Sequence, residues 1–371
     1  MLERYGHGGD LRTASEVFGR SAESFDDFSS NMNPLGPPPS IRNVLAGYLE
    51  HIHAYPDPAS RALKQTLADR HGIPENAILV GNGAAEIIDL AVRAIRPGIT
   101  ALAMPCFDEY VDAVRKLGGE IYPIPLDAEK EFELGEAEID AALERSGADL
   151  YMLGSPNNPT GRLVDSGLIY RLLDSGAYVV LDEAFLDFVP DEGKVTLVQA
   201  AAQHERFIVI RSMTKFYSVP GIRLGYAVGK PSTISRLRKL QVPWSVNSLA
   251  QQIGEAALMD AEFEARSRQW LVTERKWLTD ELRRMDMQVT PSEANYLLLR
   301  LPESSRLRLS ASQLQLEMGR RGVLIRDASR FQGLDHRYIR VAIKLREQNE
   351  RLLRALSECL GAAEDGSGDP A

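Results

Sequence analysis

The sequence predicts an α/β fold, in which a mostly parallel seven-stranded sheet is covered by helices and is followed by a smaller α+β domain. Two observations favour this fold. Short, almost entirely apolar segments alternate with segments of helical spacing between residues 77 and 228, and strands buried on both faces of a parallel sheet have this continuous apolar character. After Gly229 the pattern changes to long helices with scattered short strands, which indicates a second, smaller domain.

The large sheet is expected to contain seven strands separated by turns and helices. The strands are predicted at residues 77–80, 101–104, 120–124, 149–153, 177–181, 207–210 and 224–228. The helices among them are predicted at residues 84–95, 107–117, 136–145 and 166–175.

The segments on either side of this pattern are assigned in the same way. Residues 31–39 are too rich in proline for a helix or a central strand. Ser40 is expected to cap a helix of about 14 residues, and a second helix is expected to end near Gly72. Later helices are predicted at 233–240, 248–259, 262–285, 312–321 and 348–360, with strands at 287–290, 296–300, 323–325 and 338–343.

These segments divide the chain into four regions. Residues 1–50 form an N-terminal arm and part of the small domain, and residues 51–260 form the large domain. Residues 261–360 form the rest of the small domain. Residues 361–371 are small, acidic and contain glycine and proline, so a disordered tail is expected there.

Composition and charge exclude several classes of function. The 371 residues are 44% hydrophobic and 26% charged, which is typical of globular proteins. A net charge of -9 argues against nucleic acid as a partner. No apolar stretch is long enough to span a membrane, the two cysteines form no disulfide framework, and the chain does not start like a secretory signal. We therefore expect a cytoplasmic enzyme.

A lysine with polar neighbours lies between two of the predicted strands. Lys215 follows the strand at 207–210, with Ser212 and Thr214 just before it and Arg223 eight residues after it. A lysine amine becomes nucleophilic when burial or a cationic neighbour lowers its pKa. The hydroxyls and the guanidinium suit a phosphate dianion. The pattern indicates a Schiff-base lysine beside a phosphate clamp, as pyridoxal 5'-phosphate requires; the alternative is a surface lysine beside a turn.

Three other polar loops follow strands of the same sheet. The turn 81–83 leads into a helix at Ala84, where free amides and the helix dipole favour an anion. Asn158 and Asp182 follow two further strands. Ligands of open α/β sheets bind at the carboxyl ends of the strands, so these loops should meet Lys215. A buried Asp182 could pair with a protonated pyridine nitrogen. The alternatives are a helix cap for Asp182 and a simple Asn-Pro turn for Asn158.

Together these motifs resemble those of the fold-type I pyridoxal-phosphate enzymes, in the aminotransferase class I/II group, across almost the whole chain. A narrower resemblance is to the threonine-phosphate decarboxylase family, with the histidinol-phosphate aminotransferase family as its close relative. The general resemblance rests on segments 81–83, 155–161, 182–184, 212–215 and 220–225. The narrower one rests on segments 7–9, 27–36, 55–57 and 243–247, on Phe185 and on the C-terminal arginines.

The resemblance implies a role for each matching residue in binding the cofactor. Lys215 would form the covalent link, Asp182 would keep the pyridine nitrogen protonated, and Asn158 would donate to the phenolic oxygen of the ring. Phe107 would stack on the ring, with Tyr110 nearby. The cofactor phosphate would be held by Gly83, Ala84, Ser212, Thr214 and Arg223, joined by Tyr55 from the neighbouring subunit of a homodimer.

The resemblance also implies how a phosphorylated amino-acid substrate would bind. Arg340, on the predicted strand 338–343, matches the family's carboxylate-binding arginine, and its planar fork suits a bidentate contact. Arg326, placed at the end of the predicted strand 323–325, could hold a substrate phosphate with His7 and Asn31. No metal site is expected.

Two reactions are compatible with these residues, and the narrower resemblance implies the first of them. The first is decarboxylation of O-phospho-L-threonine to 1-amino-2-propanol phosphate in cobalamin biosynthesis. The alternative is amino transfer between histidinol phosphate and 2-oxoglutarate. Phe185 occupies a position where many aminotransferases have a tyrosine, which favours the decarboxylase. A third class, a regulatory protein without chemistry, predicts loss of the lysine, and Lys215 is present.

Overall fold

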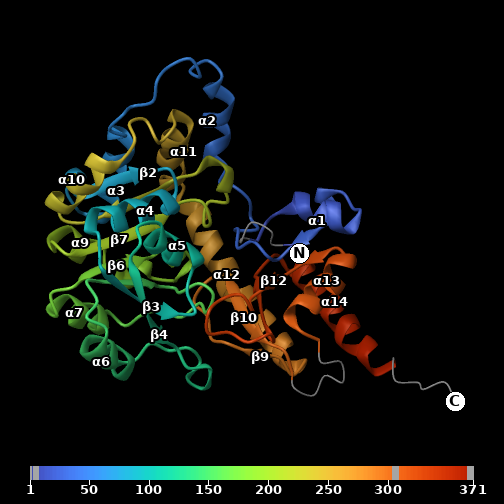
Figure 1. The fold of residues 1–371 in the computed structure, drawn as a ribbon. Coiled ribbons are helices and arrows are strands. Elements are labelled where there is room, and N and C mark those ends of the chain that lie inside the picture. Colours follow the sequence, from blue (N-terminus) through green and yellow to red (C-terminus); the bar gives the residue numbers. More distant parts are fainter. Residues whose placement is uncertain (1, 3–7, 303–308, 366–371) are drawn as a thin grey trace.

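The computed structural model describes residue 2, residues 8–302 and residues 309–365, with the side chains of 362–365 left out. The chain forms a large part around a seven-stranded sheet and a smaller part around a four-stranded sheet (Figure 1). The long helix α12 (Ala261–Arg284) runs from the large part to the small sheet, where it packs on β9 (Gln288–Val289).

The large sheet has the strand order β2-β8-β7-β6-β5-β3-β4. Of these seven strands only β8 runs opposite to the other six, since its pairings with β2 and β7 are both antiparallel, so the predicted mostly parallel sheet is confirmed. Its strands are β2 (Ile78–Gly81), β3 (Ile99–Met104), β4 (Glu120–Pro125), β5 (Leu150–Gly154), β6 (Tyr178–Asp182), β7 (Phe207–Ser212) and β8 (Gly225–Val228).

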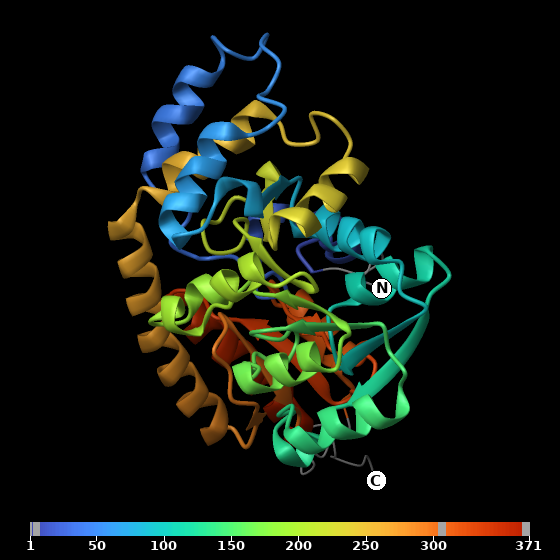
Figure 2. The ribbon, with the colours of Figure 1, turned by 90° about the vertical axis from the view of Figure 1, so that its left-hand side faces the viewer.

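Helices cover both faces of this sheet (Figure 2). One face, which we call the α4 face, is covered by α4 (Ala84–Ile95), α5 (Asp108–Lys116) and α10 (Pro231–Leu240). The other, which we call the α9 face, is covered by α3 (Arg61–His71), α6 (Glu136–Arg145), α7 (Ser166–Asp174) and α9 (Val198–Gln203).

The side chains of each central strand alternate between these two faces. Ile208 and Ile210 of β7 pack on the α4 face, whereas Phe207 and Val209 pack on the α9 face. This alternation is the ordinary geometry of a strand. Consecutive residues at the end of a strand therefore reach opposite faces, which decides where the polar residues at the strand ends point.

The small part is built on the antiparallel sheet β12-β13-β10-β9, beside a two-stranded parallel sheet β1-β11. Its strands are β1 (Asp26–Asp27), β10 (Tyr296–Arg300), β11 (Val323–Leu324), β12 (Arg326–Asp327) and β13 (Tyr338–Ala342). The remaining helices are α1 (Leu11–Phe18), α2 (Ser40–Tyr48), α8 (Glu192–Val195), α11 (Ser248–Leu258), α13 (Ala311–Arg320) and α14 (Arg346–Asp365). The short 3-10 turns are η1 (Ala22–Ser24), η2 (Glu75–Ala77), η3 (Ala128–Lys130), η4 (Leu186–Phe188) and η5 (Pro220–Ile222).

Several predicted boundaries are wrong. Helix α2 ends at Tyr48, because Leu49 beyond it stays 76% exposed and finds no packing surface in its own chain. Its capping position is Pro39, and Ser40 is already its first residue. Helix α14 continues to Asp365, five residues beyond its predicted end. The rest of the predicted tail, 366–371, lies outside the described residues.

The predicted strand 323–325 is divided between two sheets. Residues Val323 and Leu324 pair with β1 in the small parallel sheet. The chain then turns, and Arg326 pairs with Arg340 of β13 in the four-stranded sheet. Arg326 is therefore not at the end of one strand but at the start of another, beside Arg340.

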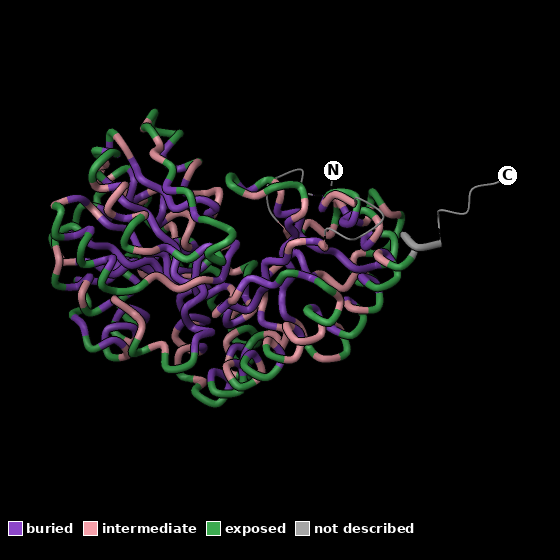
Figure 3. Tube along the Cα trace, turned by 90° about the horizontal axis from the view of Figure 1, so that it is seen from below, coloured by how far each residue is buried: buried purple, intermediate pink, exposed green. Residues whose placement is uncertain are grey.

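Buried segments run through the interior of both parts (Figure 3). Within the described ranges, no helix combines the length and the apolar character needed to cross a membrane. In the same ranges, no group of three or more His, Cys, Asp and Glu side chains is placed to hold a metal ion.

Candidate active site

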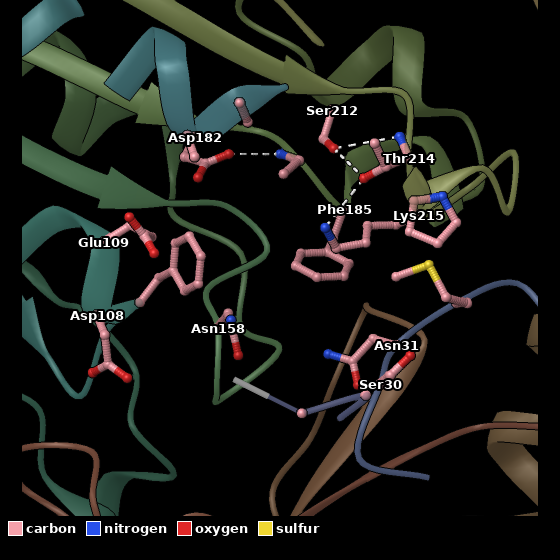
Figure 4. Close-up of a pocket in the computed structure, with 18 of the residues that line it drawn as sticks. Ser30, Asn31, Asp108, Glu109, Asn158, Asp182, Phe185, Ser212, Thr214 and Lys215 are labelled. Atoms are coloured by element: carbon pink, nitrogen blue, oxygen red, sulfur yellow. Dashed lines mark hydrogen bonds between the residues drawn. The ribbon is translucent and has the colours of Figure 1, made fainter. Parts of the chain in front are cut away.

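A cavity of about 470 Å³ lies where loops of the large sheet meet residues of the small part. Figure 4 shows its acidic, amide and hydroxyl side chains around Lys215. Of the predicted site residues, Gly83 and Tyr55 are not on its wall, and His7 lies outside the described residues. The predicted residues that line it are Asn31, Ala84, Phe107, Tyr110, Asn158, Asp182, Ser212, Thr214, Lys215, Arg223, Arg326 and Arg340.

The amine of Lys215 has the properties of a nucleophile. Burial at the base of the cavity lowers its pKa to about 8, and the positive charge of Arg223 contributes in the same direction. Its Nζ donates a hydrogen bond of 3.2 Å to Oγ1 of Thr214, as Figure 4 shows. A larger fraction of this amine is therefore neutral near pH 8 than for an ordinary lysine, so the alternative of a surface lysine does not hold.

Beside the lysine is a cradle for a dianion. Oγ of Ser212 lies 2.9 Å from Oγ1 of Thr214, and both residues line the cavity with Arg223. The first residue of α4, Ala84, also lines it, so the amide end of a helix faces the same space.

Gly83 belongs to this cradle although it does not line the cavity. It precedes α4 with a φ of 84°, a conformation that glycine adopts without strain. A Cβ at this position would lie 2.7 Å from Nη2 of Arg223. The glycine therefore allows the guanidinium to approach the end of α4.

Asp182 is a buried carboxylate held in a fixed orientation. The hydroxyl of Tyr110 donates to Oδ2 at 2.8 Å, and the amide of Ala184 donates to Oδ1 at 2.9 Å. Burial raises the pKa of Asp182 above its usual value, and these hydrogen bonds oppose the rise. Tyr110 was expected only near the ring; in the structure it orients Asp182. Asp182 is not a helix cap, since it ends β6 and the next helical turn is the short η4.

Asn158 and Arg340 form a contact that the sequence did not predict. Nη1 of Arg340 donates to Oδ1 of Asn158, and Nη2 donates to the carbonyl oxygen of Ser29 at 3.0 Å. The guanidinium also lies over the ring of Tyr296, 5.4 Å from its centre. Because Oδ1 of Asn158 accepts from Arg340, the amide nitrogen is left as the group that can donate to a ligand.

Two arginines stand directly opposite each other on the small sheet. Arg326 of β12 pairs in register with Arg340 of β13, both line the cavity, and their exposures are only 3% and 6%. Asp108, which also lines the cavity, approaches Arg326 at 3.9 Å. Like charges opposite one another on adjacent strands repel, so this wall suits anions.

Several residues of the cavity wall carried no signal in the sequence. The missed residues include Asp108, Glu109 and Phe331. Asp108 and Glu109 open helix α5, where acidic residues are common for helix stability alone. Phe331 comes from a loop of the small part and lies against Arg326. Their place in the site depends on how the two parts meet.

The residues present fit pyridoxal 5'-phosphate. The cradle at Ala84, Ser212 and Arg223 matches a phosphate dianion. Asp182 is a buried anion that a protonated ring nitrogen would complement. The neutral amine of Lys215 is suited to a bond with an aldehyde. Phe107 supplies an aromatic surface on the cavity wall.

Comparison with known proteins identifies the family. The profile of the family "Aminotransferase class I and II" matches residues 25–356. The chain belongs to this family. It is 38% identical over 366 residues to threonine-phosphate decarboxylase of Salmonella typhimurium, covering 95% of this chain and 96% of that protein. It is 31% identical over 336 residues to histidinol-phosphate aminotransferase of Methanococcus aeolicus, covering 89% of this chain and 88% of that protein.

A solved structure extends the similarity to the fold. The crystal structure of L-threonine-O-3-phosphate decarboxylase from Porphyromonas gingivalis matches with a TM-score of 0.79 at 31% identity, covering 90% of this chain and 99% of that one. Enzymes of the class I and II aminotransferase family depend on pyridoxal 5'-phosphate. The predictions of the family, the fold and the cofactor are therefore confirmed, and the protein is a pyridoxal-phosphate-dependent enzyme.

Proposed function

We propose that this enzyme decarboxylates O-phospho-L-threonine, releasing CO2 and 1-amino-2-propanol phosphate, a reaction of cobalamin biosynthesis. The observation that carries the proposal is the pair Arg326 and Arg340, two buried cations opposite one another on the wall of one cavity. A substrate with a carboxylate and a phosphate supplies an anion for each. Histidinol phosphate carries only the phosphate. The similarity to decarboxylases from two organisms supports the same choice.

Each anionic group has a place in the cavity. Arg340 is tied to Asn158 and Ser29, and we assign it the carboxylate, next to the part of the cavity that suits the cofactor ring. Arg326 lies opposite Arg340 on the adjacent strand β12 and lines the cavity with Asn31, and we assign these two the phosphate. Oδ1 of Asn31 is buried and makes no hydrogen bond among the described residues, so Asn31 is free to turn its amide donor to a ligand. His7, outside the described residues, stays a predicted third contact.

Phe185 supports decarboxylation over amino transfer. Its ring lines the cavity and is held edge-on by Tyr296, with the ring centres 5.0 Å apart. A tyrosine at this position would offer a hydroxyl to the phenolic oxygen of the cofactor. Here Asn158 is the side chain that we assign to that oxygen, so the ring is tuned by fewer donors.

In the reaction that we propose, one proton replaces the carboxylate on the α carbon. The bond between the α carbon and the carboxylate breaks, CO2 leaves, and a proton is added to the same carbon. The cofactor, when bound, supplies an electron-withdrawing ring that accepts the electron pair of the broken bond. Asp182 would hold a proton on the ring nitrogen. Lys215, with its pKa lowered to about 8, is suited to give and take a proton beside the α carbon.

We further propose that the enzyme is a homodimer in which Tyr55 serves the site of the partner. Tyr55 is 85% exposed and does not line the cavity of its own chain. Its ring contacts Trp244 at 5.5 Å between centres. Other exposed apolar side chains near α2 and this aromatic pair are Leu45, Leu49, Ile52 and Val242. Such a group of apolar side chains suits a protein interface.

Two assays on the purified enzyme test the proposed substrate. CO2 release from O-phospho-L-threonine is compared with 2-oxoglutarate-dependent amino transfer from histidinol phosphate, at equal enzyme and cofactor concentrations. We expect the first activity to be much the larger. Faster turnover of histidinol phosphate would assign the chain to the aminotransferases instead.

A further inference from the structure

A buried cluster of charged side chains lies behind the cofactor site, on the α9 face of the sheet. Its centre is Arg211, the residue before Ser212, which is fully buried. The cluster contains three cations and four carboxylates: Arg70, Glu183, Asp187, Glu192, Arg211, Glu264 and Arg268. None of these side chains lines the cavity, so the proposed chemistry does not use them.

The contacts of Arg211 join the ends of two strands. Nη1 donates to Oε2 of Glu183 at 3.0 Å, and Nη2 donates to Asp187 at 2.7 Å and to Glu192 at 3.0 Å. Glu183 follows β6, and its amide donates to the carbonyl of Ile210 in β7 at 2.8 Å. The ion pair and this backbone bond together hold the end of β6 against the end of β7, next to the last register pair, Asp182 and Ile210.

The two residues that we assign to the ends of the cofactor lie next to this ion pair in the sequence. Asp182, which faces the ring nitrogen in our assignment, precedes Glu183. Ser212, which belongs to the phosphate cradle, follows Arg211. Because side chains alternate between faces along a strand, Asp182 and Ser212 lie on the α4 face while Glu183 and Arg211 lie on the α9 face.

Stability alone is a weak reason for this arrangement. Burying ions costs desolvation energy, and well-packed apolar side chains in their place are often neutral or stabilising. Burial raises the pKa of Glu183 above its usual value, and Arg211 opposes the rise. The cluster instead supplies geometry, because the planar guanidinium of Arg211 holds several carboxylates in fixed positions.

We propose that Arg211 and Glu183 are positioning residues that set the spacing between the two anchors of the cofactor, Asp182 and Ser212. A rigid ligand bound at both ends loses affinity when its anchors shift. In catalysis, a misplacement of about 1 Å already costs on the order of 10²-fold in rate. The inference rests on the proposed roles of Asp182 and Ser212.

The test distinguishes a change in the distance between the two anchors from a loss of binding at either anchor by itself. Apoenzyme is prepared from the full-length protein and titrated with pyridoxal 5'-phosphate, with pyridoxal, which lacks the phosphate, and with inorganic phosphate. The variants are Glu183→Gln, which keeps the shape of the side chain, and Arg211→Lys, which keeps the charge but loses the fork. If Arg211→Lys does not fold, Glu183→Gln alone decides.

The matched control is Arg70→Lys, at the other side of the cluster. Arg70 pairs with Glu264 of α12 at 2.7 Å and with Glu192 at 3.5 Å, so it does not join β6 to β7. Both Glu183→Gln and Arg211→Lys should weaken pyridoxal 5'-phosphate binding about tenfold or more, the loss expected when a hydrogen bond to a charged group is misaligned. Their affinities for pyridoxal and for phosphate should stay as in the wild type, and Arg70→Lys should bind all three ligands normally.

Three results would overturn the inference. They are unchanged binding of pyridoxal 5'-phosphate in both variants, an equal loss for all three ligands, and an equal effect of Arg70→Lys. A wrong assignment of Asp182 would be detected by a separate variant: if Asp182 does not bind the ring, Asp182→Ala leaves the binding of pyridoxal unchanged. Failure of the proposed substrate also shows separately, because these titrations contain no substrate.

Discussion

Replacing Arg326 by alanine should remove the preference for a phosphorylated substrate. The side chain is 3% exposed and lies on the cavity wall, so its contact with a phosphate is shielded from water. Truncating one partner of a buried charge pair costs about 2–5 kcal/mol. Since about 1.4 kcal/mol is a factor of ten, kcat/KM for O-phospho-L-threonine should fall by roughly 30-fold to 4,000-fold.

The fall in kcat/KM should appear only with the phosphorylated substrate. Unphosphorylated L-threonine has the carboxylate that we assign to Arg340 but nothing for Arg326, so its poor turnover should barely change. Decarboxylation of both substrates is measured for the wild type, for Arg326→Ala and for the control Arg330→Ala, which truncates an exposed arginine four residues away. The variant should retain its fold, because the substitution removes one of two like charges that face each other. Equal losses on both substrates would refute the assignment of the phosphate to Arg326.

Three further predictions follow from the site. Borohydride reduction of the holoenzyme should attach the pyridoxyl group to Lys215, and a label on another lysine would contradict the assignment. The rate at which pyridoxal adds to the apoenzyme should rise with pH and become constant above about pH 8 rather than 10.5, because only the neutral amine attacks and its pKa is lowered to about 8. Asp182→Ala should lower kcat on the order of 10²–10³-fold, as removal of one preorganised electrostatic group does, with the circular dichroism of the fold unchanged; wild-type turnover would mean that the cofactor is oriented differently. Mixing the defective variants Tyr55→Ala and Lys215→Ala should restore about a quarter of wild-type activity through mixed dimers with one intact site, whereas no recovery would place Tyr55 outside the site.

The large sheet and the positions of its polar loops could be predicted because they depend on local pattern. Apolar strands followed by turns located Lys215, Asp182 and Asn158 at one edge of the sheet, and the structure places all three on one cavity wall. The glycine turn before Ala84 was visible for the same reason.

Contacts between distant segments could not be predicted in this way. Tyr110 donates to Asp182 and Arg340 donates to Asn158, but nothing in either local sequence selects its partner. The division of segment 323–327 between two sheets depends on pairing with Asp26 and with Arg340. Arg211 lies on the apolar strand β7, and its partners Glu183 and Glu192 became evident only from the packing of η4 and α8 behind the sheet.

Decarboxylation and amino transfer break different bonds at the α carbon of O-phospho-L-threonine, and an isotope experiment shows which bond this enzyme breaks. The holoenzyme is incubated with this substrate in D2O, and the products are followed by NMR together with the CO2 released. We expect 1-amino-2-propanol phosphate that retains its original α hydrogen and gains one deuterium at the same carbon, with one CO2 for each molecule consumed. A keto acid that retains the carboxylate, or no consumption of this substrate while histidinol phosphate reacts with 2-oxoglutarate, would contradict it.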